Sequence, residues 1–170
     1  VRAPLGFAAT ASLNINSWGY NTIPQAGFKG RLGFQPRGKV MGGSSSVNAM
    51  VYTRGNPHDY NTWSSLGNAG WSYQDVLPYF KKSEHNECFG ANAYRGVGGP
   101  LNVSYLRSPS PINQAFIQAC NEQGIPFNPD YNGATQFGVS PGQVTQKGGE
   151  RWNAARAYIC LLYTSPSPRD

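Results

Sequence analysis

The sequence has little of what several common functional classes require. Its 170 residues include only three cysteines, Cys88, Cys120 and Cys160, which lie far apart and form no C-x-x-C pair. This spacing argues against a disulfide framework and against a zinc site, and it favours a reducing compartment. No apolar run reaches the length of a transmembrane helix, and the first residues lack the apolar core of a secretory signal. We therefore expect a cytoplasmic location or a peripheral one at a membrane.

Histidine is equally scarce. The two histidines, His58 and His85, lie among polar residues. Neither has a second histidine or a carboxylate at the spacing of a metal site. We interpret both as surface residues and expect no metal ion.

Acidic residues are few as well, with eight Asp and Glu against fourteen Lys and Arg and a net charge of +6. The basic residues are scattered along the chain, except for Lys29, Arg31, Arg37 and Lys39. A nucleic-acid-binding surface usually shows a denser basic stripe with interleaved aromatic residues, so we expect no nucleic-acid partner. A basic module that holds nucleic acid or an anionic surface stays as the alternative from another class.

What the sequence does have is enough apolar material for a globular fold, 39% of its residues, with 13% aromatic. It also has 21 glycines and 13 prolines. These numbers indicate many turns. They also indicate that the surfaces of this chain are suited to contact with other parts of a larger protein.

One glycine-rich stretch stands out, "GKVMGGSSSVNAM" from Gly38 to Met50. Small residues let the backbone approach a ligand closely, and the N–H groups of such a loop can bind an anion. A flexible turn between two packed elements would have the same composition. The stretch is neither the phosphate loop G-x-x-x-x-G-K-[ST] nor the dinucleotide fingerprint G-x-G-x-x-G, so it does not indicate a complete nucleotide-binding domain.

Helix signals are clearest at three places. Asn56 and Ser72 are expected caps, the first followed by Pro57 and a helix to about Leu66, the second by Asp75 of a capping box. A third helix should run from Ser110 to Gly124. Its apolar residues recur at helical spacing and predict a stripe buried in the core, formed by Ile112, Ala115, Phe116, Ala119 and Cys120.

The remaining segments give weaker signals. Residues 1–34 are turn-rich and predict an extended segment, whereas residues 46–52 predict a short apolar element that begins helical and becomes strand-like. Strands are expected at residues 98–103 and 139–146, with a tight turn at residues 147–150 and a helix capped by Asn153. The last residues, "LLYTSPSPRD" from Leu161 to Asp170, look like translated adapter sequence, and we expect them to be a non-native tail.

The stretch "RGKVMGGSSSVNAMVYTRGNPHDYNTW", residues 37–63, resembles the first signature of the glucose-methanol-choline (GMC) flavin oxidoreductases. The likeness continues through "GWSYQDVLPYFKKSEHNE", "GGPLNV", "GIPFNPDYNG" and "QVTQKGGERWNAARAYI", and covers about residues 18–159. The sequence of these stretches is most similar to the branch of bacterial alcohol dehydrogenases and choline dehydrogenase-like proteins. An ordered match of this length is far more specific than one glycine motif.

The resemblance implies a mixed α/β fragment, part of a Rossmann-like FAD-binding domain and part of a substrate domain. Residues 1–69 would form the FAD side and residues 70–160 part of the substrate side. The residues implied to bind FAD are Val40, Gly42, Gly43, Ser44, Asn48, Ala49, Met50 and Val51. Some family members carry a histidine linked covalently to the flavin where this chain has Val47, so we expect FAD to be bound non-covalently.

The resemblance also implies an activity, the oxidation of a primary alcohol such as choline or an aliphatic or aromatic alcohol to an aldehyde, by hydride transfer to the flavin. Electrons would pass to a quinone or to oxygen. A non-redox relative such as a hydroxynitrile lyase is the alternative within the family. The family's G-x-G-x-x-G segment and its proton-accepting histidine are both missing, so we name no catalytic residue and expect an internal fragment that is inactive by itself.

Overall fold

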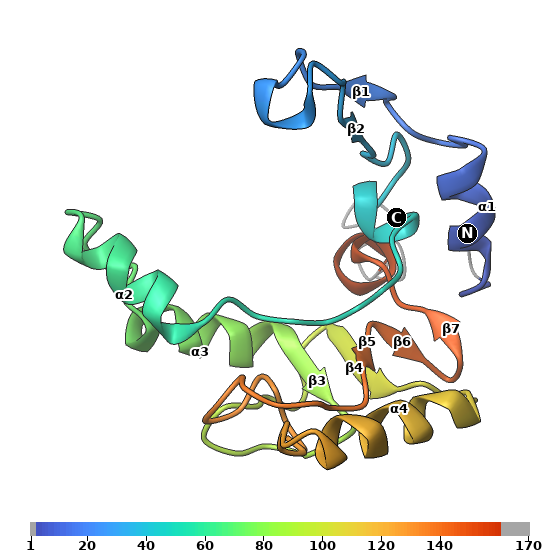
Figure 1. Cartoon of the computed structure of the whole chain (residues 1–170). Helices are drawn as coiled ribbons and strands as arrows, with labels where there is room; N and C mark the ends of the chain where they lie inside the picture. The colour runs from blue at the N-terminus through green and yellow to red at the C-terminus, as the bar shows by residue number, and fades with distance from the viewer. Residues whose placement is uncertain (1–2, 161–170) are drawn as a thin grey trace, which may run out of the picture. The chain divides into compact units, whose positions relative to one another are not determined.

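A computed structural model describes residues 3–160 of the chain, which fold as two compact units (Figure 1). The first unit contains residues 3–50 and 150–160, and the second contains Val51–Gly149. The division predicted at Gly70 separates a segment on the FAD side from one on the substrate side of the longer enzyme, and it stays a prediction. The two compact units are divided at other positions, after Met50 and after Gly149. The expected non-native tail, Leu161–Asp170, lies outside the described residues.

The first unit brings together segments from both ends of the chain. Strands β1 (Tyr20–Asn21) and β2 (Phe34–Gln35) pair antiparallel around the 3-10 turn η1 (Ala26–Phe28). The unit's other elements are helix α1 (Gly6–Ser12), the 3-10 turn η2 (Gly43–Ser46), strand β7 (Glu150–Arg151) and the π-helix η3 (Ala155–Ile159).

Two expectations for this unit were wrong. Residues 1–34 are not uniformly extended, because α1 forms at "GFAATAS", whose three alanines favour a helix too short to show a periodic pattern. The short helical element expected from residue 46 lies earlier, at η2, since the glycines permit the tight turn there. The strand predicted near Val51 is partly confirmed, because Val51 makes an isolated antiparallel bridge to Val144 in the second unit.

The second unit is built around a mixed sheet in the order β3-β4-β5. Strand β3 (Glu84–Asn86) is parallel to β4 (Leu101–Tyr105), which is antiparallel to β5 (Gln143–Val144). Helices α2 (Pro57–Ser65) and α3 (Tyr73–Ser83) precede the sheet, and α4 (Pro111–Glu122) and strand β6 (Gln146–Lys147) complete the unit. This combination of helices with a mixed sheet confirms the predicted mixed α/β class.

The helix starts were predicted correctly because capping is a local interaction. The Oδ1 of Asn56 accepts from the backbone N–H of His58 at 2.9 Å, and the N–H of Asn56 donates to Asp59 Oδ2 at 3.1 Å. Ser72 and Asp75 form the same reciprocal box at α3. Each box satisfies N–H groups that a helix start leaves without partners.

The apolar stripe of α4 was predicted to be core, and this was wrong. Ile112 and Phe116 are 75% and 64% exposed, and Ala115 and Ala119 are exposed as well. Only Cys120 of the predicted stripe is half-buried. Helical periodicity identifies an apolar face but does not show which segment packs on it. In the described part of this chain, most of that face is exposed to solvent.

Candidate functional site

The glycine-rich loop of the first unit turns at two glycines with left-handed backbone angles. Gly42 has φ of +86° and Gly43 has φ of +56°, a region that side chains with a Cβ rarely adopt. A Cβ on Gly42 would lie 2.6 Å from Ser46 Oγ and 3.1 Å from the backbone N of Ala155. The loop therefore packs too closely at Gly42 to admit any larger residue.

Gly43 faces the opposite situation, because a Cβ there would have no atom within 4 Å. Nearby, Gly38 approaches the carbonyl group of Gly43 so closely that a Cβ on Gly38 would overlap it. The loop is thus held tightly on one side and open at Gly43, which leaves backbone accessible to a ligand.

Two of the three serines hold the loop in place. Ser45 Oγ donates to Gly42 O at 2.5 Å and accepts from the backbone N–H of Ala154 at 2.9 Å. Ser46 Oγ donates to Met41 O at 2.8 Å and accepts from Asn153 Nδ2 at 2.7 Å. These bonds tie the loop to the chain that leads into η3. Only the exposed Ser44, which accepts from Gly38 N at 3.1 Å, is left facing outward.

Arg151 lies beneath this loop and is completely buried. Its Nη1 donates to Ser45 O and to Asn48 Oδ1, both at 3.0 Å. Within the described residues its Nε and Nη2 have no hydrogen-bond partner. Burial lowers the pKa of the Arg151 guanidinium, and no charged neighbour within residues 3–160 opposes that effect. Arg151 is a candidate site residue that the sequence analysis did not identify.

Asn48 receives two donors on one oxygen. Its Oδ1 accepts from Arg151 Nη1 and also from the backbone N–H of Met50 at 3.0 Å. The second bond accompanies a left-handed backbone at Met50, with φ of +66°, while the Met50 side chain is 4% exposed. A non-glycine residue in this conformation stores strain that the surroundings must support, and such strain is concentrated at functional sites.

A cavity of about 180 Å³ lies beside the loop, entirely within the first unit. Most of its lining is apolar, which is typical of small-molecule sites. Of the predicted FAD-binding residues, Ser44, Asn48 and Ala49 line it. The other lining residues are Phe7, Thr10, Asn14, Ile15, Ser17, Phe34, Pro36, Arg37 and Val47.

The remaining predicted FAD-binding residues are placed differently. Gly42 and Gly43 form the turn next to the cavity, Val40 is exposed just before it, and Met50 is buried just after it. Val51 is 61% exposed and belongs to the second unit. The structure thus places most of the predicted set around one loop, while their contact with a cofactor stays a prediction.

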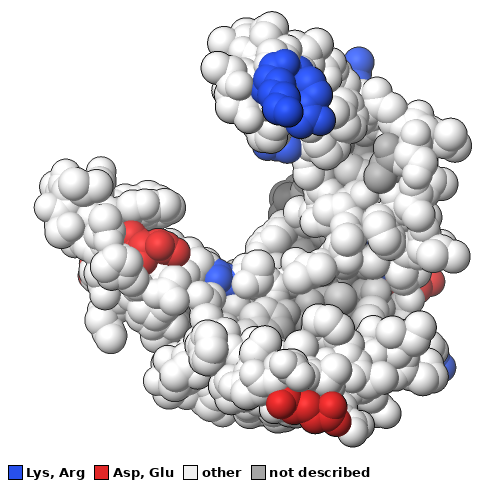
Figure 2. Space-filling view, viewed as in Figure 1, with Lys and Arg blue, Asp and Glu red and all other residues white. Residues whose placement is uncertain are grey.

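The basic residues near this loop in the sequence are exposed (Figure 2). Figure 2 shows basic side chains gathered over the β1–β2 segment, which carries Lys29 and Arg31. Arg37 lines the cavity, and Lys39 places its Nζ 4.7 Å from the ring centroid of Trp18. Positive charge is therefore present on the first unit close to the cavity.

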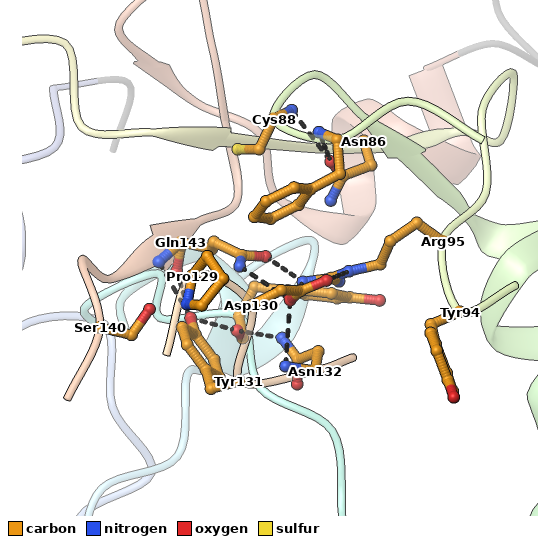
Figure 3. Close-up of polar contacts among 12 residues, drawn as sticks. Asn86, Cys88, Tyr94, Arg95, Pro129, Asp130, Tyr131, Asn132, Ser140 and Gln143 are labelled. Atoms are coloured by element: carbon orange, nitrogen blue, oxygen red, sulfur yellow. Dashed lines mark hydrogen bonds and ion pairs between the residues drawn. The ribbon is translucent and has the colours of Figure 1, made fainter. Parts of the chain in front are cut away.

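The second unit contains a buried ion-pair network, of which Figure 3 shows the part around Arg95 and Asp130. Glu84 accepts from both Arg54 and Arg95 at 2.8 Å. Arg95 also donates to Asp130 and to Gln143, as the dashed lines in Figure 3 show. Burial acts to raise the pKa of Asp130, but the hydrogen bonds and charge of Arg95 outweigh it and hold that pKa below its ordinary value. This network is closed, and it anchors the unit.

No described side chain has the properties of a catalytic base or nucleophile near the loop. His58 is exposed, as expected, and His85 is half-buried in β3, where its Nδ1 accepts from Gly98 N at 2.9 Å. The three cysteines are unbridged, and burial raises the pKa of Cys88 to about 11, so that thiol stays protonated at neutral pH. Residues 3–160 contain no cluster of His, Cys, Asp or Glu suited to a metal ion.

No helix in residues 3–160 is both long enough and apolar enough to cross a membrane. This finding agrees with the hydropathy of the sequence.

Comparison with known proteins gives consistent results. The profile of the family described as GMC oxidoreductase matches residues 7–165. The chain is 45% identical over 167 residues to the alcohol dehydrogenase [acceptor] of Pseudomonas putida, covering 98% of this chain and 30% of that protein. It is 46% identical to the mitochondrial choline dehydrogenase of Mus musculus, covering 90% of this chain and 26% of that protein.

Among solved structures, the fold is similar to pyridoxine 4-oxidase from Mesorbium loti, with a TM-score of 0.84 and 34% identity over 93% of this chain and 31% of that one. An FAD-dependent oxidoreductase from Chaetomium thermophilum gives a TM-score of 0.80 at 32% identity, covering 89% of this chain and 28% of that one. The chain spans less than a third of the length of each of these relatives.

Proposed function

The chain belongs to the GMC oxidoreductase family, and from that premise we propose that it is part of an FAD-dependent enzyme that oxidises a primary alcohol to an aldehyde. When bound, FAD would accept a hydride from the alcohol carbon. The observation that carries the proposal is the loop at Gly42–Asn48, tightly held, open at Gly43 and bordered by a largely apolar cavity. Choline and aliphatic or aromatic alcohols are the proposed substrate classes.

The residues of the loop fit a flavin cofactor. A flat ring system needs close backbone approach, which the open side of Gly43 offers, and polar ring atoms need donors, which the amide of Asn48 offers. The buried Arg151 adds a positive charge near the loop that no described carboxylate compensates, and this charge is suited to stabilise the negative charge of a reduced flavin. We propose Val40, Gly42, Gly43, Ser44, Asn48, Ala49, Met50 and Val51 as the residues that hold FAD.

The proposed attachment is non-covalent. Val47 lines the cavity next to Asn48, and its hydrocarbon side chain has no atom that could form a bond to the flavin. Precipitation of the holoenzyme with acid should release the yellow colour completely into the supernatant. Colour retained in the pellet after washing would contradict a non-covalent cofactor.

This chain's residues supply binding and orientation, and we assign the proton-accepting role to none of them. His58 and His85 lie in the second unit, and each is accounted for by its exposure or by its bond to Gly98. The 170-residue chain by itself is therefore proposed to be inactive. Electrons from the reduced cofactor would pass to a quinone or to oxygen.

The test compares the full-length protein that carries this chain with the 170-residue chain alone. Both are purified, desalted and examined by visible absorption. We expect a flavin spectrum in the full-length protein only, bleached under anaerobic conditions by choline, 1-butanol or benzyl alcohol. A full-length protein that gains no flavin spectrum when FAD is added would contradict the proposal.

The same preparation separates the proposal from the non-redox alternative within the family. A flavin spectrum that none of the alcohols bleaches, together with cyanide release from a hydroxynitrile, would identify a lyase. Bleaching by an alcohol without cyanide release would support the oxidoreductase.

A further inference from the structure

We propose that Arg151 is the positioning residue of the cofactor loop, which it serves by fixing the amide of Asn48 with its Nδ2 directed to the ligand. This inference rests on the proposed function, because it takes FAD as that ligand. Arg151 is not one of the residues expected to bind FAD, and it lies more than a hundred positions from the loop in the sequence.

The first step is the orientation of the amide. An asparagine side chain can present either its oxygen or its nitrogen to a given neighbour, and the hydrogen-bond network decides which. Here one end of the Asn48 amide meets two donors at 3.0 Å, Arg151 Nη1 and the backbone N–H of Met50. Because two donors require an acceptor, that end must be the oxygen. A reversed amide would oppose N–H groups to N–H groups.

The second step concerns the other end of the same amide. Asn48 is exposed and lines the cavity, and its Nδ2 makes no hydrogen bond to any described residue. A donor held at the rim of an apolar cavity selects a ligand with an acceptor atom. The carbonyl oxygens and ring nitrogens of a flavin are acceptors of this kind, and the mostly apolar lining of the cavity favours that ring as the partner of Asn48 Nδ2.

The third step concerns charge. The guanidinium of Arg151 is fully buried, and its only partners among the described residues are two neutral oxygens. Its Nε and Nη2 have no partner in residues 3–160. An uncompensated charge in a poorly solvated site acts over longer distances than one in water. It should favour the more negative, reduced form of the cofactor and so raise the midpoint potential.

The experiment uses the full-length holoenzyme and measures two quantities, the dissociation constant of FAD and the midpoint potential of the bound flavin. The variants are Arg151→Met, Arg151→Lys, Asn48→Ala and the double variant Arg151→Met with Asn48→Ala. Arg156→Met is the matched control. The Arg156 side chain is 31% exposed, pairs with Glu150 at 2.7 Å and donates to the backbone O of Arg151 at 3.0 Å without contacting the loop. Arg156→Met therefore removes a neighbouring guanidinium that supports the Arg151 backbone, and it leaves the bonds of the Arg151 guanidinium in place.

We expect Arg151→Met and Asn48→Ala each to weaken FAD binding about tenfold, which corresponds to the loss of one hydrogen bond of about 1.4 kcal/mol. The double variant should bind no more weakly than Asn48→Ala, because Arg151 acts through Asn48. Arg151→Met should also lower the midpoint potential. Arg151→Lys keeps the positive charge but not the planar guanidinium that bonds Ser45 and Asn48. It should therefore retain the midpoint potential of the unaltered protein and still bind FAD more weakly.

Three results would overturn the inference: equal behaviour of Arg151→Met and Arg156→Met in both measurements, additive losses in the double variant, or unaltered affinity in Arg151→Lys. The lysine variant keeps the test decisive if Arg151→Met fails to fold. An unaltered protein that holds no flavin would instead contradict the proposed function. An unaltered protein that holds flavin, with Arg151 variants indistinguishable from the control, would remove this inference alone.

Discussion

The two compact units each bury an arginine, and the two arginines have opposite surroundings. Arg95, in the second unit, is fully buried and pairs with Glu84 and Asp130. Arg151, in the first unit, is equally buried and contacts no carboxylate among the described residues. Burial tends to lower the pKa of both, but Asp130 and Glu84 raise that of Arg95 overall, whereas that of Arg151 stays lowered. One arrangement is complete in itself, and the other is suited to receive a ligand.

Breaking the complete arrangement should have the largest effect. Arg95→Met takes one of two arginine partners from the buried Glu84 and the arginine partner from the half-buried Asp130. Loss of one member of a buried pair costs about 3–5 kcal/mol. We expect the urea midpoint of the full-length protein to fall accordingly. Lys82→Met, at an exposed lysine near the end of α3, is the control. A loss below about 1 kcal/mol would mean that the network contributes little.

The next effect concerns the glycine pair on the other side of the comparison. Gly42→Ala combines a left-handed backbone with a Cβ placed 2.6 Å from Ser46 Oγ, and should cost about 3 kcal/mol. Gly43→Ala has the left-handed backbone but open space, and should cost about 1 kcal/mol. Thermal melting of the two variants checks the difference. Equal losses would show that close packing at Gly42 is unimportant.

A smaller effect should appear in acid. The pKa of Asp130 is lowered in the folded protein, so its stabilising contribution is present above its ordinary value of 3.8 and is lost as the pH falls through the folded value. Asp130→Asn should therefore flatten the acid side of a plot of melting temperature against pH. Glu122→Gln, on exposed α4, should leave that side unchanged. An unchanged acid slope in Asp130→Asn would contradict the assignment.

The smallest effect on stability should come from Arg151, despite its complete burial. Arg151→Met removes two hydrogen bonds to neutral oxygens but also removes an uncompensated buried charge, and these changes oppose each other. We expect the free energy of unfolding to change by less than about 1 kcal/mol when measured without added FAD. A loss as large as that of Arg95→Met would erase the distinction between the two arginines.

The sequence predicted best those features that depend on neighbouring residues. The caps at Asn56, Ser72 and Ser110 were placed correctly because each is a contact over two or three positions. The burial of α4 was predicted wrongly because it depends on a partner surface, and the 75% exposure of Ile112 has no local signature. The spacing of apolar residues along a helix does not show whether a distant segment packs against them.

The candidate site divides in the same way. The loop and its glycines could be recognised from composition and from the resemblance, and the structure places Ser44, Asn48 and Ala49 around one cavity. Arg151 could not be found, because a single arginine after a turn carries no sign that it will be buried beneath a loop far away in the sequence. Its proposed role rests on the hydrogen-bond partners that its Nε and Nη2 lack among residues 3–160, and these become visible only in the folded structure.

The distance along the chain between Arg151 and the loop also sets an order of events during synthesis. Ser45 leaves the ribosome 106 residues before Arg151, and at about 5–20 residues per second that interval lasts roughly 5–20 s. The loop cannot acquire its buried support, nor Asn48 its fixed amide, until the later segment has emerged. The proposed cofactor loop of a nascent chain therefore gains its support from Arg151 only after the whole second unit has been made.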